Sequence, residues 1–175
     1  MSRWVLGVDI GGTNVVVGMV PEGGGPPAAL RVRATRSMEG AEGAVGHIAR
    51  LAGQVMEEVR SGPAGPDLTV MGVGVGCPGP LDLEAGIVLD AFNLGWTDFP
   101  LRDRLQDALG LPTVLENDAN CATYGEWWQG AGAPYSSLVG LTLGTGIGGG
   151  LVVDGRLVRG ASGTAREVGH TTIDF

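Results

Sequence analysis

Apolar and polar positions in the first part of the chain predict several strands and one helix. Two runs rich in β-branched residues, at 5–8 and 15–20, flank a short polar turn and predict a hairpin. A third strand is predicted at 29–35, where apolar and basic residues alternate. At 41–60 apolar side chains recur every three or four residues, which predicts an amphipathic helix. Residues 68–76, rich in valine and glycine, predict a buried strand.

The remaining pattern predicts shorter elements. Residues 87–89 are expected to be extended, and 93–96 are interpreted as a polar and aromatic loop. A helix is predicted at 100–109, with proline in its first turn. A strand at 113–115 runs directly into a helix at 119–129. The order strand, strand, strand, helix, strand is typical of an α/β or α+β layer with antiparallel hairpins on one side.

Composition narrows the function classes. The chain has 175 residues, 43% of them hydrophobic, which suffices for a core in one domain or in one and a part. A net charge of −8 argues against nucleic acid as the main partner. All basic residues are arginine, so a Walker A lysine and the lysine of protein kinases are both excluded. Nucleotide chemistry would therefore have to use backbone amides, Asp, Thr and a metal ion.

Cysteine usage and hydropathy indicate a cytoplasmic location. Cys77 and Cys121 lie far apart and neither belongs to a CxxC pair, which fits reduced thiols better than a disulfide scaffold or a zinc site. No run of about 18 apolar residues is present that would predict a membrane span. A strand begins soon after residue 3, so we expect no signal peptide.

The first turn carries candidate chemistry in the sequence Asp9-Ile10-Gly11-Gly12-Thr13-Asn14. Glycine allows positive φ and close backbone approach, so the turn can present backbone N–H groups to a phosphate. A carboxylate beside that phosphate can hold a divalent metal ion or its water. The alternative is an ordinary glycine hairpin in which Asp and Asn act only as turn formers.

Two further stretches follow strand ends. Gly76-Cys77-Pro78-Gly79-Pro80-Leu81-Asp82 is a rigid bend that either lines a cleft or is a plain loop. Glu116-Asn117-Asp118 lies at a strand-to-helix junction, where active-site groups of α/β proteins are common. An Asp there can take a proton from a substrate hydroxyl that the adjacent Asn orients. The alternative is that Asp118 only caps the helix.

A second glycine-rich stretch spans 143–150, with the sequence Leu-Gly-Thr-Gly-Ile-Gly-Gly-Gly. It satisfies G-x-G-x-x-G, but a dinucleotide site requires a helix next. Here apolar residues and an Asp-Gly turn follow, which predicts another hairpin. The two glycine-threonine hairpins form a weak internal repeat, which suggests two related lobes that grip a polyphosphate from both sides.

These motifs, together with Glu167-Val168-Gly169-His170, occur in the order seen in the ROK family of bacterial sugar kinases and related repressors. Within that family the chain is most similar to glucokinases. The resemblance implies an α/β fold of the ribonuclease-H-like, actin-like ATPase type. It implies a first lobe over residues 1–120, with the first phosphate hairpin and the catalytic Asp. It also implies that residues 121–175 begin a second lobe with the second phosphate loop.

The resemblance assigns roles to single positions. Asp118 matches the catalytic base that accepts the proton of the sugar 6-hydroxyl. Asn117, Glu167 and His170 match sugar ligands, and His170 also matches a ligand of a structural zinc. Positions matching nucleotide and phosphate contacts are Asp9, which is also expected near Mg²⁺, Gly11, Gly12, Thr13, Gly144, Thr145, Gly146 and Gly148. The expected substrates are ATP and a hexose.

The sequence departs from the family pattern at two places. Arg166 stands where a glycine is usual, which can crowd the sugar site or pair with Glu167. The chain ends at Phe175, before the cysteine-rich zinc motif, a further sugar-binding glutamate and most of the second lobe. We therefore expect an N-terminal fragment with weak or no activity, and structural Zn²⁺ only in a full-length parent.

The function expected from the resemblance is ATP-dependent phosphorylation of a hexose, most readily glucose, to the 6-phosphate, by a homodimer or tetramer. Fructose, mannose and N-acetylhexosamines remain open as substrates. The alternative is a non-catalytic sugar-binding protein or an inactive remnant. A repressor is disfavoured because only eight residues precede Asp9, too few for a DNA-binding helix-turn-helix.

Overall fold

A computed structural model describes residues 2–35, 40–62, 65, 67–144, 146–161, 163–165 and 167–172. Contacts divide the chain into two compact units, Met1–Glu116 and Asn117–Phe175. The lobe boundary predicted after residue 120 would fall inside helix α3 (Asp118–Gln129).

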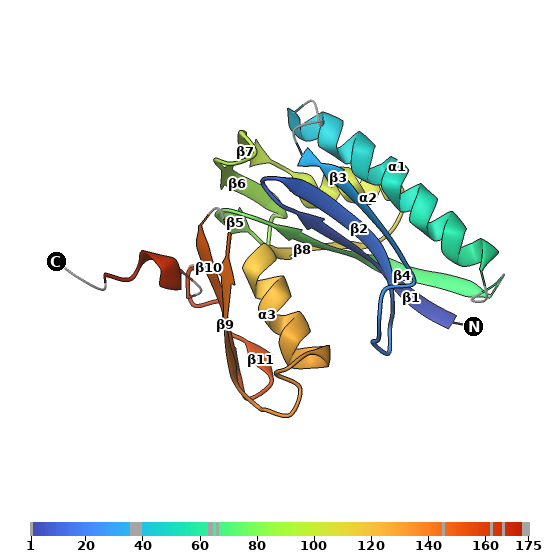
Figure 1. Ribbon diagram of the computed structural model, residues 1–175. Helices are drawn as coiled ribbons and strands as arrows, with labels where there is room; N and C mark the ends of the chain where they lie inside the picture. The colour runs from blue at the N-terminus through green and yellow to red at the C-terminus, as the bar shows by residue number, and fades with distance from the viewer. Residues whose placement is uncertain are drawn as a thin grey trace. The chain divides into compact units, whose positions relative to one another are not determined.

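The first unit is built on a five-stranded sheet in the order β3-β2-β1-β4-β8 (Figure 1). Strand β1 pairs antiparallel with β2 and parallel with β4, and β2 pairs antiparallel with β3. The predicted first hairpin is therefore confirmed. The strands are β1 (Ser2–Ile10), β2 (Asn14–Pro21), β3 (Ala29–Ala34), β4 (Leu68–Cys77) and β8 (Thr113–Asn117).

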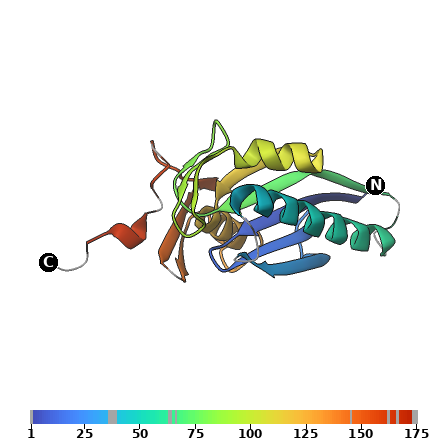
Figure 2. The same ribbon diagram turned by 90° about the horizontal axis from the view of Figure 1, so that it is seen from above.

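Two helices cover one face of this sheet. Helices α1 (Gly40–Ser61) and α2 (Leu101–Leu109) lie side by side, as Figure 2 shows. Both were predicted within one residue of these bounds, but Pro100 occupies the N-cap position rather than the first turn. The core joins the apolar stripe of α1 to the inward side chains of β1 and β2, which are Leu6, Val8, Ile10, Val15, Val17 and Met19.

The alternation of β1 decides where its carboxylate lies. Leu6, Val8 and Ile10 are buried, whereas Asp9 between the last two is exposed. Because successive side chains of a strand point to opposite faces, Asp9 lies on the face away from the helices. On that face Val114 of β8 is 68% exposed and Leu30 of β3 is 47% exposed.

Between β4 and α2 the chain forms a small antiparallel sheet. Its strands are β5 (Leu81–Asp82), β6 (Ile87–Ala91) and β7 (Trp96–Phe99). The sequence analysis missed β7. Trp96 begins it because its ring is buried, with only 4% exposed, and its backbone pairs with Ala91 across the intervening turn.

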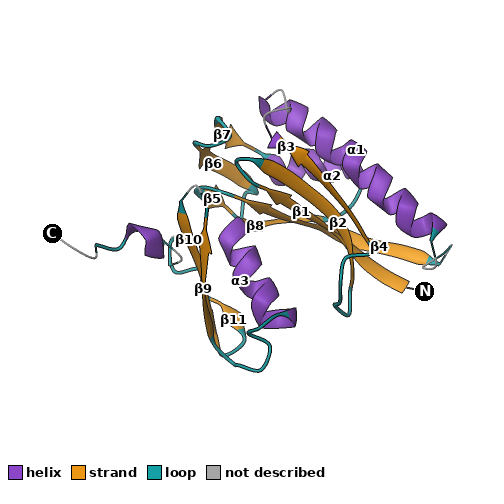
Figure 3. Ribbon diagram, viewed as in Figure 1, coloured by secondary structure: helices purple, strands orange, loops and turns teal. Residues whose placement is uncertain are grey.

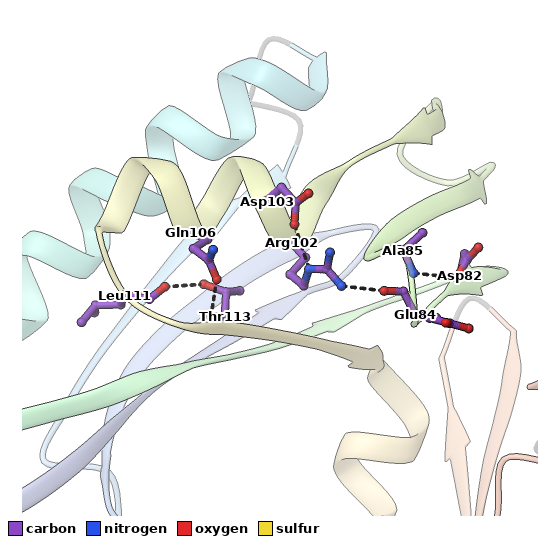
Figure 4. Close-up of polar contacts among 8 residues, drawn as sticks. All are labelled: Asp82, Glu84, Ala85, Arg102, Asp103, Gln106, Leu111 and Thr113. Carbon is purple, nitrogen blue, oxygen red and sulfur yellow. Dashed lines mark hydrogen bonds and ion pairs between the residues drawn. The ribbon is translucent and has the colours of Figure 1, made fainter.

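Arg102 fixes the β5–β6 turn to the start of α2 (Figure 4). Its Nη1 donates to the Glu84 carbonyl at 2.8 Å, and its Nε donates to Asp103 Oδ1 at 2.8 Å. The backbone N–H of Arg102 donates to the carbonyl of Gly86, which has φ +77°. A Cβ at Gly86 would lie 2.6 Å from the guanidinium, so only glycine permits this contact.

The second unit places α3 against an antiparallel sheet of β9 (Leu138–Leu143), β10 (Ile147–Val153) and β11 (Arg156–Leu157) (Figure 3). The predicted second hairpin and the helix predicted at 119–129 are thus confirmed. A 3₁₀ helix, η2 (Val168–His170), follows. The β10–β11 turn has positive φ at Asp154 and Gly155, as the Asp-Gly pair predicts.

Glycines let α3 approach the hairpin closely. A Cβ at Gly140 or Gly150 would lie 2.2 or 2.3 Å from Oγ1 of Thr123. The other face of the hairpin exposes Leu141 and Leu143, at 61% and 80%. No described helix is both long and apolar enough to cross a membrane.

Replacing Arg102 by alanine is expected to destabilise the first unit by about 1 kcal/mol, the typical net contribution of a hydrogen bond to stability. Water can hydrate the exposed Glu84 carbonyl that the variant leaves behind. Arg104→Ala is the control, because its ion pair with Glu42 is exposed on both sides and contributes little. Urea unfolding followed by circular dichroism compares the two; equal midpoints would contradict the role of Arg102.

Candidate active site

The first glycine turn connects β1 and β2 and is held by the chain that follows β3. The Gly11 N–H donates to the Asn14 carbonyl at 2.9 Å, and Thr35 Oγ1 donates to the Gly11 carbonyl at 2.6 Å. Neither Gly11 nor Gly12 has positive φ, so the conformational reason first offered for glycine does not apply. Glycine at position 11 instead permits close approach of the backbone, since a Cβ there would lie 3.0 Å from the Asn14 carbonyl oxygen. Gly12 and Thr13 are exposed.

Asp9 lies just before this turn and pairs with Gly76 of the parallel strand β4. The carboxyl ends of β1 and β4 therefore meet, which is where α/β sheets bind ligands. The exposed carboxylate suits Mg²⁺, a hard cation that usually takes one or two carboxylates together with phosphate oxygens. Among the described residues no three His, Cys, Asp or Glu side chains converge as a metal-binding group.

The bend after β4 lines a small cavity, in line with the cleft interpretation. The cavity has a volume of about 190 Å³, and its walls come from the bend and from the end of β6 with the turn after it. A Cβ at Gly79, where φ is +89°, would lie 2.2 Å from the Asp90 carbonyl, so glycine brings the two walls together. The lining residues are Pro78, Gly79, Pro80, Asp90, Ala91, Phe92 and Asn93.

The second unit contains the strand-to-helix junction. Asn117, not Asp118, is the N-cap of α3: its Oδ1 accepts from the N–H groups of Ala119 and Asn120 at 3.0 and 3.2 Å. Asp118 is the first helical residue, is partly exposed, and accepts from the Ala119 N–H at 2.9 Å. A carboxylate in the first turn interacts favourably with the helix dipole. The junction thus assigns the cap and the acidic group to different residues.

The second glycine loop lies against the first turn of α3. A Cβ at Gly148 would lie 3.0 Å from the Cβ of Ala119, the neighbour of Asp118. The Gly144 N–H donates to the Gly146 carbonyl at 2.9 Å, and both glycines are exposed. Thr145, the loop residue between them, lies outside the described residues.

The predicted sugar pair packs on the same loop. A Cβ at Gly169 would lie 2.2 Å from the Ile147 carbonyl, so η2 contacts β10 directly. His170 Nε2 and Glu167 Oε2 are 3.8 Å apart, and the His170 side chain is 83% exposed. Arg166, expected to crowd this place, lies outside the described residues.

The second unit therefore assembles three motifs that are separate in the sequence. Ala119 joins the Asp118 junction to Gly148, and Gly169 joins the Glu167–His170 pair to Ile147. In the first unit, Asn93 contacts Gly12: a Cβ at Gly12 would lie 3.4 Å from that of Asn93. The sequence analysis did not foresee this contact, and the unpredicted strand β7 is what closes the turn that makes it.

The sequence profile of the ROK family matches residues 5–175. The chain belongs to the ROK family. Its fold is the mixed α/β fold of ROK sugar kinases, of the actin-like ATPase type, as expected.

Among curated relatives, a glucokinase of Halalkalibacterium halodurans is 36% identical over 172 residues, covering 98% of this chain and 51% of the relative. A xylose repressor of Caldicellulosiruptor bescii is 42% identical over 121 residues, which cover 69% of this chain and 30% of the repressor. The solved structure of a ROK family glucokinase of Streptomyces griseus, in complex with glucose and AMPPNP, is 35% identical in sequence and matches with a TM-score of 0.78. The match covers 98% of this chain and 51% of the glucokinase chain. This ROK chain thus spans about half the length of the glucokinases it matches.

The capping role of Asn117 gives a test within this ROK site. Asn117→Ala removes the acceptor of two N–H groups and is expected to lower the free energy of unfolding by about 1 kcal/mol. Asn117→Asp keeps an acceptor oxygen and should retain most of that stability. Thermal unfolding by circular dichroism measures both variants. An alanine variant as stable as the wild type would show that the cap is dispensable.

Proposed function

We propose that the protein to which this chain belongs is an ATP-dependent hexose kinase, with glucose as its preferred substrate. The observation that carries the proposal is the assembly of Asp118, the glycine loop at 144–148 and the Glu167–His170 pair within one unit. An acid–base group, an exposed glycine loop and a pair of polar side chains are parts that phosphoryl transfer to a sugar can use.

In the proposed reaction Asp118 accepts the proton of the sugar 6-hydroxyl as that oxygen attacks the γ-phosphorus of ATP. A new P–O bond forms at the sugar, the bond from the γ-phosphorus to ADP breaks, and the proton leaves on the carboxylate. The position of Asp118 at the start of α3, partly exposed, supports this role. Proton transfer by such a group contributes roughly 10²–10⁴-fold to the rate.

The sugar hydroxyls are proposed to bind Asn117, Glu167 and His170. Because the Asn117 carboxamide oxygen caps α3, this residue would meet a hydroxyl through Nδ2, as a donor. Glu167 supplies acceptor oxygens, and His170 presents an exposed imidazole.

The phosphates are proposed to bind the two glycine turns, at Gly11, Gly12 and Thr13 and at Gly144, Thr145, Gly146 and Gly148. Mg²⁺, held by Asp9, would neutralise charge on the transferring phosphoryl group. Structural Zn²⁺ at His170 is proposed only for a protein that brings further ligands, because the described residues form no such group.

Glucose is favoured over other hexoses by the glucokinase relatives, one of which was solved with glucose and an ATP analogue. A second candidate function is sugar binding without catalysis, favoured by the 42% identity to a xylose repressor. The two differ in one respect that is simple to measure: only the kinase produces ADP in response to the sugar.

The test is a coupled assay of ADP release with MgATP and a panel of glucose, mannose, fructose and N-acetylglucosamine. Glucose-dependent turnover is expected in the complete protein. The 175-residue chain alone is expected to show little, since it spans half the length of the glucokinases. Sugar binding without ADP release by the complete protein would favour the second candidate.

Asp118→Asn is expected to lower kcat by about 10²–10⁴-fold while the sugar still binds, because the amide cannot accept the proton. Glu116→Gln tests the neighbouring carboxylate, and Asp107→Asn tests an exposed one on α2. Both controls should keep kcat near that of the wild type. A loss confined to Glu116→Gln would move the base to that residue.

A further inference from the structure

Thr35, the residue that follows β3, makes two hydrogen bonds to the first glycine turn. Its hydroxyl donates to the Gly11 carbonyl at 2.6 Å, and its backbone N–H donates to the Thr13 carbonyl at 2.8 Å. One residue thus binds the turn at its first and its last position, Gly11 and Thr13. All of these residues belong to the first unit.

The two hydrogen bonds differ in what they require of the sequence. The bond from the Thr35 N–H extends the pairing of β2 with β3, in which Asn14 lies opposite Ala34, and any residue except proline can donate it. The other bond needs a side-chain hydroxyl. Its oxygen–oxygen distance of 2.6 Å lies within the range of about 2.5–3.0 Å for O–H···O hydrogen bonds. Thr35 is also partly buried, which limits competition from water.

The Gly11 carbonyl belongs to the same peptide group as the Gly12 N–H. A trans peptide group is planar, and its C=O and N–H bonds point in opposite directions. No peptide bond in the described part of the chain is cis. A carbonyl that accepts from the Thr35 hydroxyl therefore turns the Gly12 N–H away from Thr35. Gly12 is an exposed residue, so a ligand can approach this side of the turn.

The conformation of the turn has to be selected by contacts of this kind. Two consecutive glycines can adopt many backbone conformations, and neither Gly11 nor Gly12 uses the positive φ that glycine permits. The Thr35 hydroxyl fixes the peptide group between them. Asn93 packs beside the second glycine, since a Cβ at Gly12 would lie 3.4 Å from that of Asn93. Donors that are already oriented need no reorganisation when a charged group binds.

We propose that Thr35 is a positioning residue for phosphate: its hydroxyl orients the Gly11–Gly12 peptide group so that the Gly12 N–H donates to a phosphate oxygen of the nucleotide. This inference rests on the proposed function, in that it takes the nucleotide phosphates as the ligand of the first turn. It uses contacts within the first unit alone. Thr35 acts through the peptide group and does not itself touch the nucleotide, so its loss weakens nucleotide binding and leaves sugar binding intact.

The experiment measures binding of the ATP analogue AMPPNP with Mg²⁺ to the complete protein by isothermal titration calorimetry. Thr35→Val keeps the branched shape and removes the hydroxyl. It is expected to raise the Kd for AMPPNP about three- to tenfold, which corresponds to the usual net contribution of one hydrogen bond. Thr35→Ser keeps the hydroxyl and should stay within about twofold of the wild type. The Kd for glucose should not change in either variant.

Thr113→Val is the matched control. Thr113 also donates its hydroxyl to a backbone carbonyl of the first unit, that of Leu111 at 3.0 Å, at the start of β8 (Figure 4). Its replacement should lower the free energy of unfolding by a similar amount and leave the Kd for AMPPNP unchanged, because this bond lies outside the turn. Thermal unfolding by circular dichroism establishes that each variant is folded at the temperature of the titration.

Two results would overturn the role of Thr35: a Thr35→Val variant that binds AMPPNP as tightly as the wild type, or an equal loss of affinity in Thr113→Val. If Thr35→Val does not fold, the NMR spectrum of the wild type decides. The Gly12 amide resonance is expected to shift on addition of AMPPNP with Mg²⁺, and an unmoved resonance would overturn the proposal.

The kinase activity fails separately. A wild type that binds AMPPNP but releases no ADP from ATP with any sugar of the panel would overturn the proposed reaction, and the Thr35 variants would still decide how the turn binds phosphate. A wild type that binds no nucleotide at all would overturn both proposals.

Discussion

Close approach of backbone segments at glycine is the constraint on which both units depend. Gly79 permits the bend after β4 to meet β6, and Gly140 and Gly150 permit α3 to lie against its hairpin. Gly148 and Gly169 bring the predicted catalytic and sugar-binding segments to one loop. Glycine loses more conformational entropy on folding than other residues, so the 33 glycines in 175 residues must be offset by stabilising contacts. At the positions named above, glycine permits close packing between elements.

Of these glycines, Gly148 is also a predicted phosphate-binding position. The glycine-rich stretch at 143–150 has an exposed part before β10 and a part within β10 that packs against α3. Gly148 and Gly150 face α3 and provide packing space, whereas Gly144 and Gly146 are exposed at the loop. Gly148 and Gly150 share one face because residues two apart in a strand point the same way, whereas Gly144 and Gly146 precede the strand. The phosphate role is therefore proposed for the exposed members and for Gly148 at the end of the loop.

The strand-to-helix junction shows a similar division of roles. A helix start needs acceptors for its first N–H groups, and a proton-transfer site needs a carboxylate that a substrate can reach. Asn117 meets the first need with its carboxamide oxygen, while one carboxylate oxygen of the partly exposed Asp118 also accepts from the Ala119 N–H. Helix geometry thus explains Asn117, while the catalytic role of Asp118 stays a proposal.

The sequence by itself determined most of the elements, the two hairpins and the family, because these follow from local patterns: β-branched runs at 5–8 and 15–20, the apolar stripe at 41–60 and the ordered motifs. It also named the candidate site residues, whose roles stay proposals. Only the tertiary structure decided which of them meet, which residue caps α3, and that Trp96 begins a strand. Those outcomes depend on burial and on contacts between segments far apart in the chain, such as Gly12 with Asn93 and Ile147 with Gly169, and no local pattern specifies such contacts.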